Sequence, residues 1–528
     1  MPGDESYGGT GTKLSASSAR DTLTSGEAIV AYLAFIKLLL HLATANVYGL
    51  FVDELYFLAC GEHLSWGYVD MPPLTALQAW LARSLFGDSM LAVRLFPALA
   101  GAGLVLLTGA ITRELGGRRF AQGLATLAVL VAPGYLLVGS YLSMNSIEPL
   151  LWMGCVLVLI RIIRSGNVKL WLWFGVLTGL GIENKDTMLL FASALSAGLL
   201  LSPERRTMAN RWFIAGALIA FLIFLPNLMW MIQHNFPHLE LLANIRRNER
   251  NVSLSPLQFF GQQILAMQPL AFPIWLCGLC TLLLGRNGKP YRALGWAYLL
   301  TLGALLAMHG RFYYLMPIYP MLFAAGAVAM ESWFRARHWS WAPRAYATLV
   351  VVTGTFFAPI AMPILPPDTL VRYTELLGVS QPALEHRQSS ALPQLFADRF
   401  GWPEMVATVA MVYKNLPPDE REKTAIFGTD YGEAGAIDFY GQQLGLPKAI
   451  SGHLTYWYWG PGPYTGESVI VLGAHNRDNL EKYFTSVEEV ASVGHRFAMA
   501  SQHFPVYLCR GPRGRTLQEI WPELKNWN

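Results

Sequence analysis

Long apolar stretches separated by short polar segments fill the first two thirds of the chain. Their lengths suit an α-helix that crosses the hydrocarbon core of a bilayer, which takes about 17–25 residues. They lie at 27–48, 91–112, 120–139, 147–165, 211–232, 260–285, 292–309, 312–334 and 343–364. The stretch 168–202 adds two shorter spans, broken by the polar Glu183-Asn184-Lys185-Asp186. The pattern therefore predicts a polytopic α-helical membrane protein with about eleven transmembrane helices.

The tail, residues 366–528, follows a different pattern in which short apolar runs alternate with helix-like segments. A helix is expected after the first run, up to about Gln443, and another near Asp478–Phe484. The runs that read as strands are Thr424–Phe427, Ser468–Leu472 and Val506–Leu508. Runs of this length with helices between them predict a small soluble α/β domain.

Composition supports this division of the chain. Hydrophobic residues make up 53% and charged residues 14%, whereas soluble proteins carry about 25% charge. Charged residues occupy 32 of the 163 tail positions but only 42 of the first 365, so we place a boundary near Pro366-Pro367. Residues 1–25 are polar and are expected to be a disordered N-terminus. The net charge of +4, without a basic run, argues against a nucleic-acid partner.

The distribution of Lys and Arg predicts the orientation. Loops on the side of the N-terminus, with that terminus included, carry 17 of these residues, and loops on the opposite side carry six. Cytoplasmic loops are enriched in Lys and Arg, so the N-terminus is expected in the cytoplasm. An odd number of spans then places the tail outside, in the periplasm or its equivalent. We expect a multi-pass protein of the bacterial inner membrane.

The candidate chemistry gathers on the outer side. Asp53-Glu54 follows the first apolar stretch, and Asp70 lies in the same outer loop, residues 49–90, within Tyr68-Val69-Asp70-Met71-Pro72-Pro73. Carboxylates can accept protons and cations can hold an anion. Further ionisable groups on this side include Glu148, Lys185, His234, Arg246, Arg247 and Arg311. This clustering predicts an active site at the outer membrane surface.

The same loop contains an amphipathic segment. Leu74, Leu77, Leu81 and Leu85 recur at helical spacing, so one face is apolar. Such helices lie in the plane of the membrane interface, where this one would form a rim around a cavity open to lipid.

Three motifs carry a resemblance to a known family. The Asp-Glu pair after the first span, the Y-V-D-M-P-P-L stretch and R-F-Y-Y-L-M-P-I-Y-P at 311–320 resemble the GT-C membrane glycosyltransferases. The closest match is the bacterial branch of the protein O-mannosyltransferase family, which includes the lipid A aminoarabinose transferases. The resemblance covers residues 27–365 and not the tail. It implies transfer of a hexosyl or pentosyl group from a polyprenyl-phosphate carrier to a hydroxyl of a protein, lipid or envelope glycan.

The resemblance also implies roles for single residues. Asp53 falls on the position of the base that accepts the proton of the acceptor hydroxyl, with Glu54 in support. Asp70 falls on a second carboxylate that in relatives precedes Lys-Pro-Pro, and Met71 replaces that lysine here. The carrier phosphate calls for permanently charged donors. Our candidates are Lys185 and Arg311, then Tyr313, Arg246 and Arg247, with Glu148 and His234 as additional site residues.

Several alternatives stay open. Asp53-Glu54 could be a helix cap, Lys185 could pair with Asp186 to end two short spans, and Arg246, Arg247 and Arg250 could contact anionic lipid. Some relatives supply a Glu-His pair for a metal, and this sequence offers His234, His238 and Glu240 instead, so we expect no obligatory metal ion.

The competing function is a transporter or flippase for a lipid-linked or anionic substrate. Transporters are typified by internal repeats and by sites near the bilayer midplane. Neither is visible in the sequence, which favours an enzyme.

Overall fold

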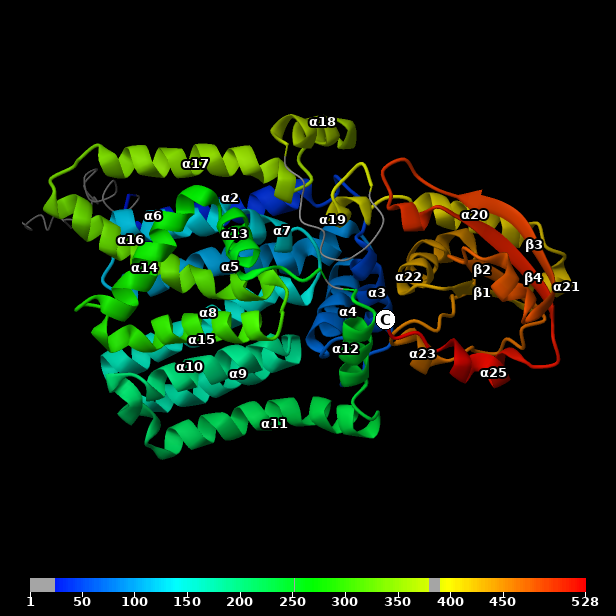
Figure 1. Cartoon of the computed structure of the whole chain (residues 1–528), viewed down its shortest axis with the longest axis horizontal. Coiled ribbons are helices and arrows are strands. Elements are labelled where there is room, and N and C mark those ends of the chain that lie inside the picture. The colour runs from blue at the N-terminus through cyan, green and yellow to red at the C-terminus, as the bar shows by residue number, and fades with distance from the viewer. Residues whose placement is uncertain (1–23, 251, 379–389) are drawn as a thin grey trace, which may run out of the picture.

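The structure, a computed structural model, describes residues 24–250, 252–378 and 390–528. The expectation for residues 1–25 therefore falls almost wholly outside the described part. Helices of the first 365 residues lie side by side, and the tail with its small sheet lies at one end of them (Figure 1).

Each of the eleven apolar stretches is helical in the structure. Most form one main helix, but Pro133 divides one stretch into α6 and α7, and a break at Met267-Gln268 divides another into α13 and α14. The helices are α2 Gly26–Thr44, α5 Met90–Glu114, α6 Arg119–Val131, α7 Pro133–Val138, α8 Met144–Ser165, α9 Trp171–Asn184, α10 Thr187–Leu200, α11 Arg211–Gln233, α13 Pro256–Ala266, α14 Phe272–Leu284, α15 Arg292–Ala307, α16 Tyr319–Ala336 and α17 Ala342–Ala361.

Fewer than eleven helices meet the length and composition expected of a membrane span. Within the described ranges, six helical segments are long and apolar enough to cross a bilayer, and a seventh is added if α13 and α14, bent by 96°, form one span. Helices α9 and α10 have 14 residues each, or about 21 Å, which is less than the roughly 30 Å hydrocarbon core. The count of about eleven spans stays a prediction.

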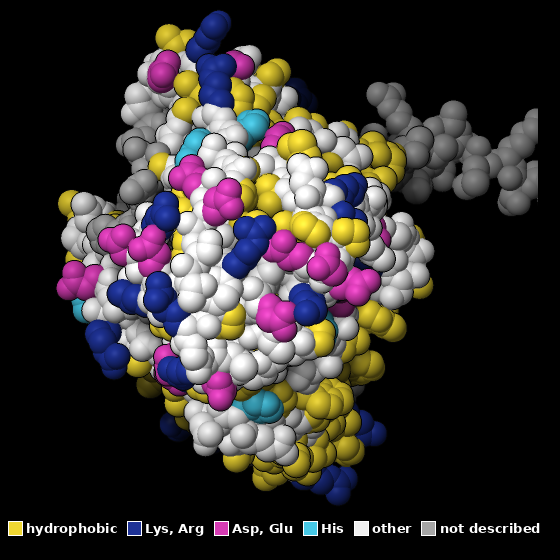
Figure 2. Space-filling view, turned by 90° about the vertical axis from the view of Figure 1, so that its right-hand side faces the viewer, with side chains coloured by type: hydrophobic (Ala, Val, Ile, Leu, Met, Phe, Trp, Pro, Cys, Tyr) yellow, Lys and Arg dark blue, Asp and Glu magenta, His cyan; other side chains and the backbone are white. Residues whose placement is uncertain are grey.

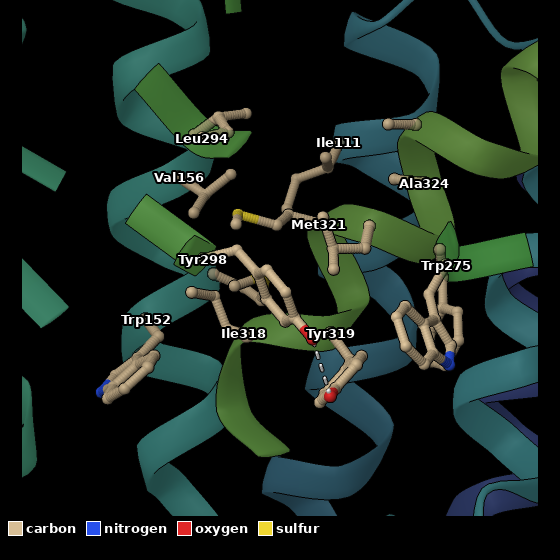
Figure 3. Packing of buried hydrophobic residues seen from close by; sticks show 14 of the residues in the cluster. Ile111, Trp152, Val156, Trp275, Leu294, Tyr298, Ile318, Tyr319, Met321 and Ala324 are labelled. Carbon is tan, nitrogen blue, oxygen red and sulfur yellow. Dashed lines mark hydrogen bonds between the residues drawn. The ribbon is translucent and has the colours of Figure 1, made fainter. Parts of the chain in front are cut away.

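The helical body has one large core (Figure 3). Trp152 stacks on Phe191 at 4.1 Å between ring centroids, and the hydroxyls of Tyr298 and Tyr319 lie 3.3 Å apart. Glycines bring α14 and α16 together, because a Cβ at Gly326 would lie 1.8 Å from the Ile274 carbonyl oxygen. Small residues at such contacts allow close packing between membrane helices.

The outer loop folds into two helices, α3 Val52–Glu62 and α4 Leu74–Phe86. The amphipathic segment predicted near residues 74–85 is helical, and its outward face exposes Leu77, Trp80 and Leu85. An exposed apolar face at this position suits a helix that lies against lipid.

The tail contains a four-stranded sheet in the order β1-β2-β4-β3. Its strands are β1 Thr424–Gly428, β2 Ser468–Leu472, β3 Phe484–Val493 and β4 Phe504–Pro512. β1 and β2 are parallel, and the other pairs are antiparallel. The three predicted strands are confirmed, but the helix expected near Asp478–Phe484 is only Arg477–Glu481, and β3 follows it. β3 was missed because it is an edge strand with exposed polar residues such as Glu488 and Glu489.

The tail shares a second core with the outer loop. Leu55 and Phe57 of α3 are buried in one cluster with Val406 of α20 (Trp402–Lys414) and Ile437 of α22 (Tyr431–Tyr440). The face of the tail turned away from the body carries charges of both signs (Figure 2). The tail thus has a charged outer face, and its inner face packs against the outer loop through a shared hydrophobic core.

Candidate active site

A cavity of about 430 Å³ lies where the outer loop, the helical body and the tail meet. Its lining includes polar side chains as well as the apolar Leu137, Leu265, Phe357 and Ile360. An amphipathic ligand with a polar head and an apolar chain fits such a lining. The polar side chains include Asp53, Tyr56, Asp70, Lys185, His238, Arg250, Arg311, Tyr313 and Tyr431.

Asp53 and Glu54 point in different directions from the first turn of α3. Asp53 lies in the cavity wall, and its Oδ1 accepts a hydrogen bond of 2.7 Å from the Tyr431 hydroxyl. Glu54 is fully buried, and its Oε2 accepts the backbone N–H of Phe51 at 2.8 Å. The helix-cap interpretation therefore applies to Glu54, and Asp53 faces the ligand space.

Arg94 holds Glu54 in place. Its Nη2 lies 2.7 Å from Glu54 Oε2, and it also donates to the carbonyls of Ala45, Tyr48 and Gly49. Burial alone would raise the pKa of Glu54, but the charge and hydrogen bonds of Arg94 outweigh it and hold that pKa below its ordinary value. This buried pair fixes the turn that presents Asp53.

Asp70 is the second carboxylate in the wall. Its Oδ1 accepts a hydrogen bond of 2.7 Å from the hydroxyl of Tyr56. Burial raises the pKa of Asp70, and the charges of His238 and His453 oppose that rise. Asp70 therefore keeps a proton more readily than an exposed aspartate.

Lys185 enters the wall at the break between α9 and α10. Its Nζ donates to Asn145 Oδ1 at 2.7 Å and to Glu148 Oε2 at 3.0 Å. It also lies 4.3 Å from the centre of the Tyr314 ring. The alternative in which Lys185 pairs with Asp186 does not hold, because Lys185 pairs with Glu148 and Asp186 lies 3.2 Å from His238 Nε2.

Arg311 and Tyr313 lie in the same part of the wall. Arg311 Nη1 donates to the Tyr313 hydroxyl at 3.0 Å, and the Tyr313 ring centre is 5.6 Å from Lys185 Nζ. The structure thus brings both predicted cations and this tyrosine together.

The other predicted residues lie outside the wall. Arg246 and Arg247 are exposed at the end of α12, Pro237–Arg247. The nearby Arg250 lines the cavity instead, and its Nη1 donates to the carbonyl oxygen of Asn528. Glu148 lies behind Lys185 as its ion-pair partner. His234 stacks on Trp230 at 4.1 Å and packs against Tyr458.

A metal ion would need a suitable arrangement of acidic and imidazole groups. Within the described ranges, no group of three or more His, Cys, Asp or Glu side chains is arranged to hold a metal ion. Of the residues that the sequence offers in place of a Glu-His pair, Glu240 pairs with Lys525 in the tail.

Sequence reasoning missed several residues of the site. Arg94 could have been recognised in the sequence, because it is an isolated cation at the start of an apolar stretch. A charge at such a position is costly unless it is paired. Arg250 is expected from the sequence only as a contact for anionic lipid, and Tyr56 and Tyr431 are not distinguished by any pattern in the sequence. Tyr431 in particular meets Asp53 across 378 positions of the chain.

Comparisons with known proteins agree with this architecture. The sequence model of the dolichyl-phosphate-mannose-protein mannosyltransferase family matches residues 70–230. The lipid A galacturonosyltransferase RgtD of Rhizobium johnstonii is 26% identical over 269 residues, which are 49% of this chain. The chain spans 56% of the length of that relative.

Two crystal structures of ArnT from Cupriavidus metallidurans, one bound to undecaprenyl phosphate and one in the apo state, have the same fold. The TM-scores are 0.60 and 0.58, both at 14% identity, over 92% and 94% of this chain and 99% and 100% of the ArnT chains. The fold and the sequence matches confirm that this integral membrane protein is similar to the GT-C membrane glycosyltransferases and, among them, to the protein mannosyltransferase family.

Proposed function

We propose that the protein is a glycosyltransferase that moves a sugar from a polyprenyl-phosphate carrier to an acceptor hydroxyl at the outer face of the bacterial inner membrane. The observation that carries this proposal is the cavity, whose lining combines carboxylates, among them Asp53 and Asp70, with cations and apolar side chains. The ArnT structure bound to undecaprenyl phosphate has the same fold and supports a carrier of this class.

The cations are suited to the carrier phosphate. Lys185, Arg250 and Arg311 line the cavity, and hydrogen bonds from charged donors to phosphate are stronger than neutral ones. The apolar lining from α7, α13 and α17 would receive the first units of the prenyl chain. Glu148 orients Lys185, because the buried carboxylate fixes its ammonium group at 3.0 Å.

Asp53 is suited to be the general base. The acceptor hydroxyl oxygen attacks the anomeric carbon, the bond from that carbon to the phosphate oxygen breaks, and the phosphate leaves with the electron pair. The hydroxyl proton passes to Asp53 as the new bond forms. Asp70, which holds its proton more readily, would bind a hydroxyl of the sugar or the acceptor. Glu54 does not face the cavity, and its role would be to fix the first turn of α3, which presents Asp53.

The test compares Asp53→Asn with the parent protein in a transfer assay with polyprenyl-phosphate sugars. Loss of the base should lower the transfer rate by about 10²–10⁴-fold and leave donor binding in place, because the cations are unchanged. Glu62→Gln at the far end of α3 is the matched control, since Glu62 pairs with Arg83 and Lys448 instead of facing the cavity.

Two results would contradict the proposal. If Asp53→Asn transfers normally while Asp70→Asn is inactive, Asp70 is the base. If neither substitution affects transfer, the cavity is not the site of this reaction.

A further inference from the structure

The hydroxyl that contacts Asp53 comes from the tail. Tyr431 is the first residue of α22, and a capping box fixes the start of that helix: Asp430 Oδ1 accepts from Gly432 N at 2.7 Å, and Glu433 Oε2 accepts from Asp430 N at 3.0 Å. Reciprocal caps of this kind set the direction in which a helix begins. The Tyr431 side chain is thereby aimed at α3, where its hydroxyl lies 2.7 Å from Asp53 Oδ1.

Tyr431 is also held through its ring. The ring centre lies 4.9 Å from that of Tyr56 and 4.9 Å from that of His453. Tyr56 in turn donates its hydroxyl to Asp70 at 2.7 Å. Asp53 and Asp70 are therefore each bonded to a tyrosine, and the two tyrosines pack against each other.

The backbones of α22 and α3 approach closely enough to make this contact rigid. A Cβ at Gly432 would lie 2.4 Å from Val52 Cγ2, and a Cβ at Gly435 would lie 2.9 Å from the Leu55 carbonyl carbon. In addition, Val52 N donates to the Asp398 carbonyl of the tail at 3.2 Å. The tail is thus fastened to the residue that directly precedes Asp53.

We propose that Tyr431 is a positioning residue of the transferase site, so that the tail forms part of the catalytic unit. The inference rests on the proposed role of Asp53 as base. The Tyr431 hydroxyl fixes one carboxylate oxygen and thereby the rotation of the carboxylate toward the acceptor. Misplacement of a reacting group by about 1 Å can cost about 10²-fold in rate, so this contact has a measurable effect on transfer.

The central variant is Tyr431→Phe, which keeps the ring and its packing and removes only the hydroxyl. We expect kcat to fall by about 10–100-fold while the donor KM stays within about twofold, since Tyr431 is not among the residues proposed to hold the phosphate. In an Asp53→Asn background the same substitution should have no further effect on kcat, because Tyr431 acts through Asp53.

Tyr456→Phe is the matched control. The Tyr456 hydroxyl donates to Asp438 Oδ2, also at 2.7 Å, and its ring lies 6.4 Å from that of Tyr56, but neither Tyr456 nor Asp438 lines the cavity. The Tyr456→Phe variant also loses a hydrogen bond between a tyrosine and an aspartate. It therefore measures how such a loss affects stability away from the cavity. Rates are normalised to the amount of folded protein, measured by size-exclusion chromatography in detergent.

The outcomes separate the two proposals. Full kcat in Tyr431→Phe beside an inactive Asp53→Asn overturns the inference alone, as does an equal loss in Tyr431→Phe and Tyr456→Phe. Full activity of Asp53→Asn overturns the assignment of the base and this inference with it. A selective loss in Tyr431→Phe that disappears in the Asp53→Asn background supports both.

Discussion

Lys185 shows how one side chain can serve both packing and ligand binding. Lys185 as a whole is 8% exposed. Its ammonium group pairs with the buried Glu148, and the residue also lines the cavity. A buried carboxylate without its cation is costly, so substitution of Lys185 has two effects. These effects can be separated by changing Glu148 as well.

For Lys185→Ala we expect the donor KM to rise by about 10–150-fold, which corresponds to a charge-assisted contact of ~1.5–3 kcal/mol. The thermal stability should fall too, because Glu148 loses its partner. Adding Glu148→Gln should restore the stability but not the donor affinity, and Arg246→Ala, at an exposed position outside the wall, should leave both unchanged. Recovery of donor affinity in the double variant would show that Lys185 acts only as the partner of Glu148.

At the scale of elements, the apolar stretches predicted the helices of the body because membrane helices need long apolar runs and short breaks. The break at Lys185-Asp186 and three of the four strands were likewise readable from the sequence. Asp53, Asp70, Lys185 and Arg311 line the same cavity, as expected from the prediction that they share one side of the membrane. The partners of Asp53 and Glu54 were not readable, since Tyr431 meets Asp53 and Arg94 meets Glu54 only through tertiary packing, across 378 and 40 positions.

The ion pair between Glu54 and Arg94 joins the start of α3 to the start of α5, and its contribution should depend on pH. Because the folded-state pKa of Glu54 lies below the ordinary value of 4.5, its stabilisation is complete well above pH 4.5 and is lost as the pH falls through the lowered folded pKa. Glu54→Gln should reduce the free energy of unfolding by about 3–5 kcal/mol at pH 7, since Arg94 is left unpaired in a buried site.

Thermal unfolding in detergent at pH 7 and at progressively lower pH measures this effect. The difference between the parent protein and Glu54→Gln should shrink toward acidic pH, and a difference that grows instead would contradict the assignment. Glu62→Gln, which removes a partly exposed surface pair, should change the stability by about 1 kcal/mol or less.

At the scale of the whole molecule, the tail and the outer-loop helices lie at the same end of the helical body (Figure 1), and residues of both line the cavity. The site can function at the outer face only if the tail lies there as well. Reporter fusions after residue 370 should therefore show periplasmic alkaline phosphatase activity. A fusion after residue 287, in a predicted cytoplasmic loop, is the control and should show none, and the reverse pattern would overturn the orientation and the site together.

The contact between Tyr431 and Asp53 also has a consequence in time. The two residues are separated by 378 positions, so at about 5–20 residues per second the ribosome adds Tyr431 roughly 20–75 s after Asp53. During that interval the outer loop has already left the ribosome, but α3 lacks the helix that packs on it. We therefore expect a newborn chain that has inserted all of its membrane helices to be inactive until the tail has folded against the outer loop.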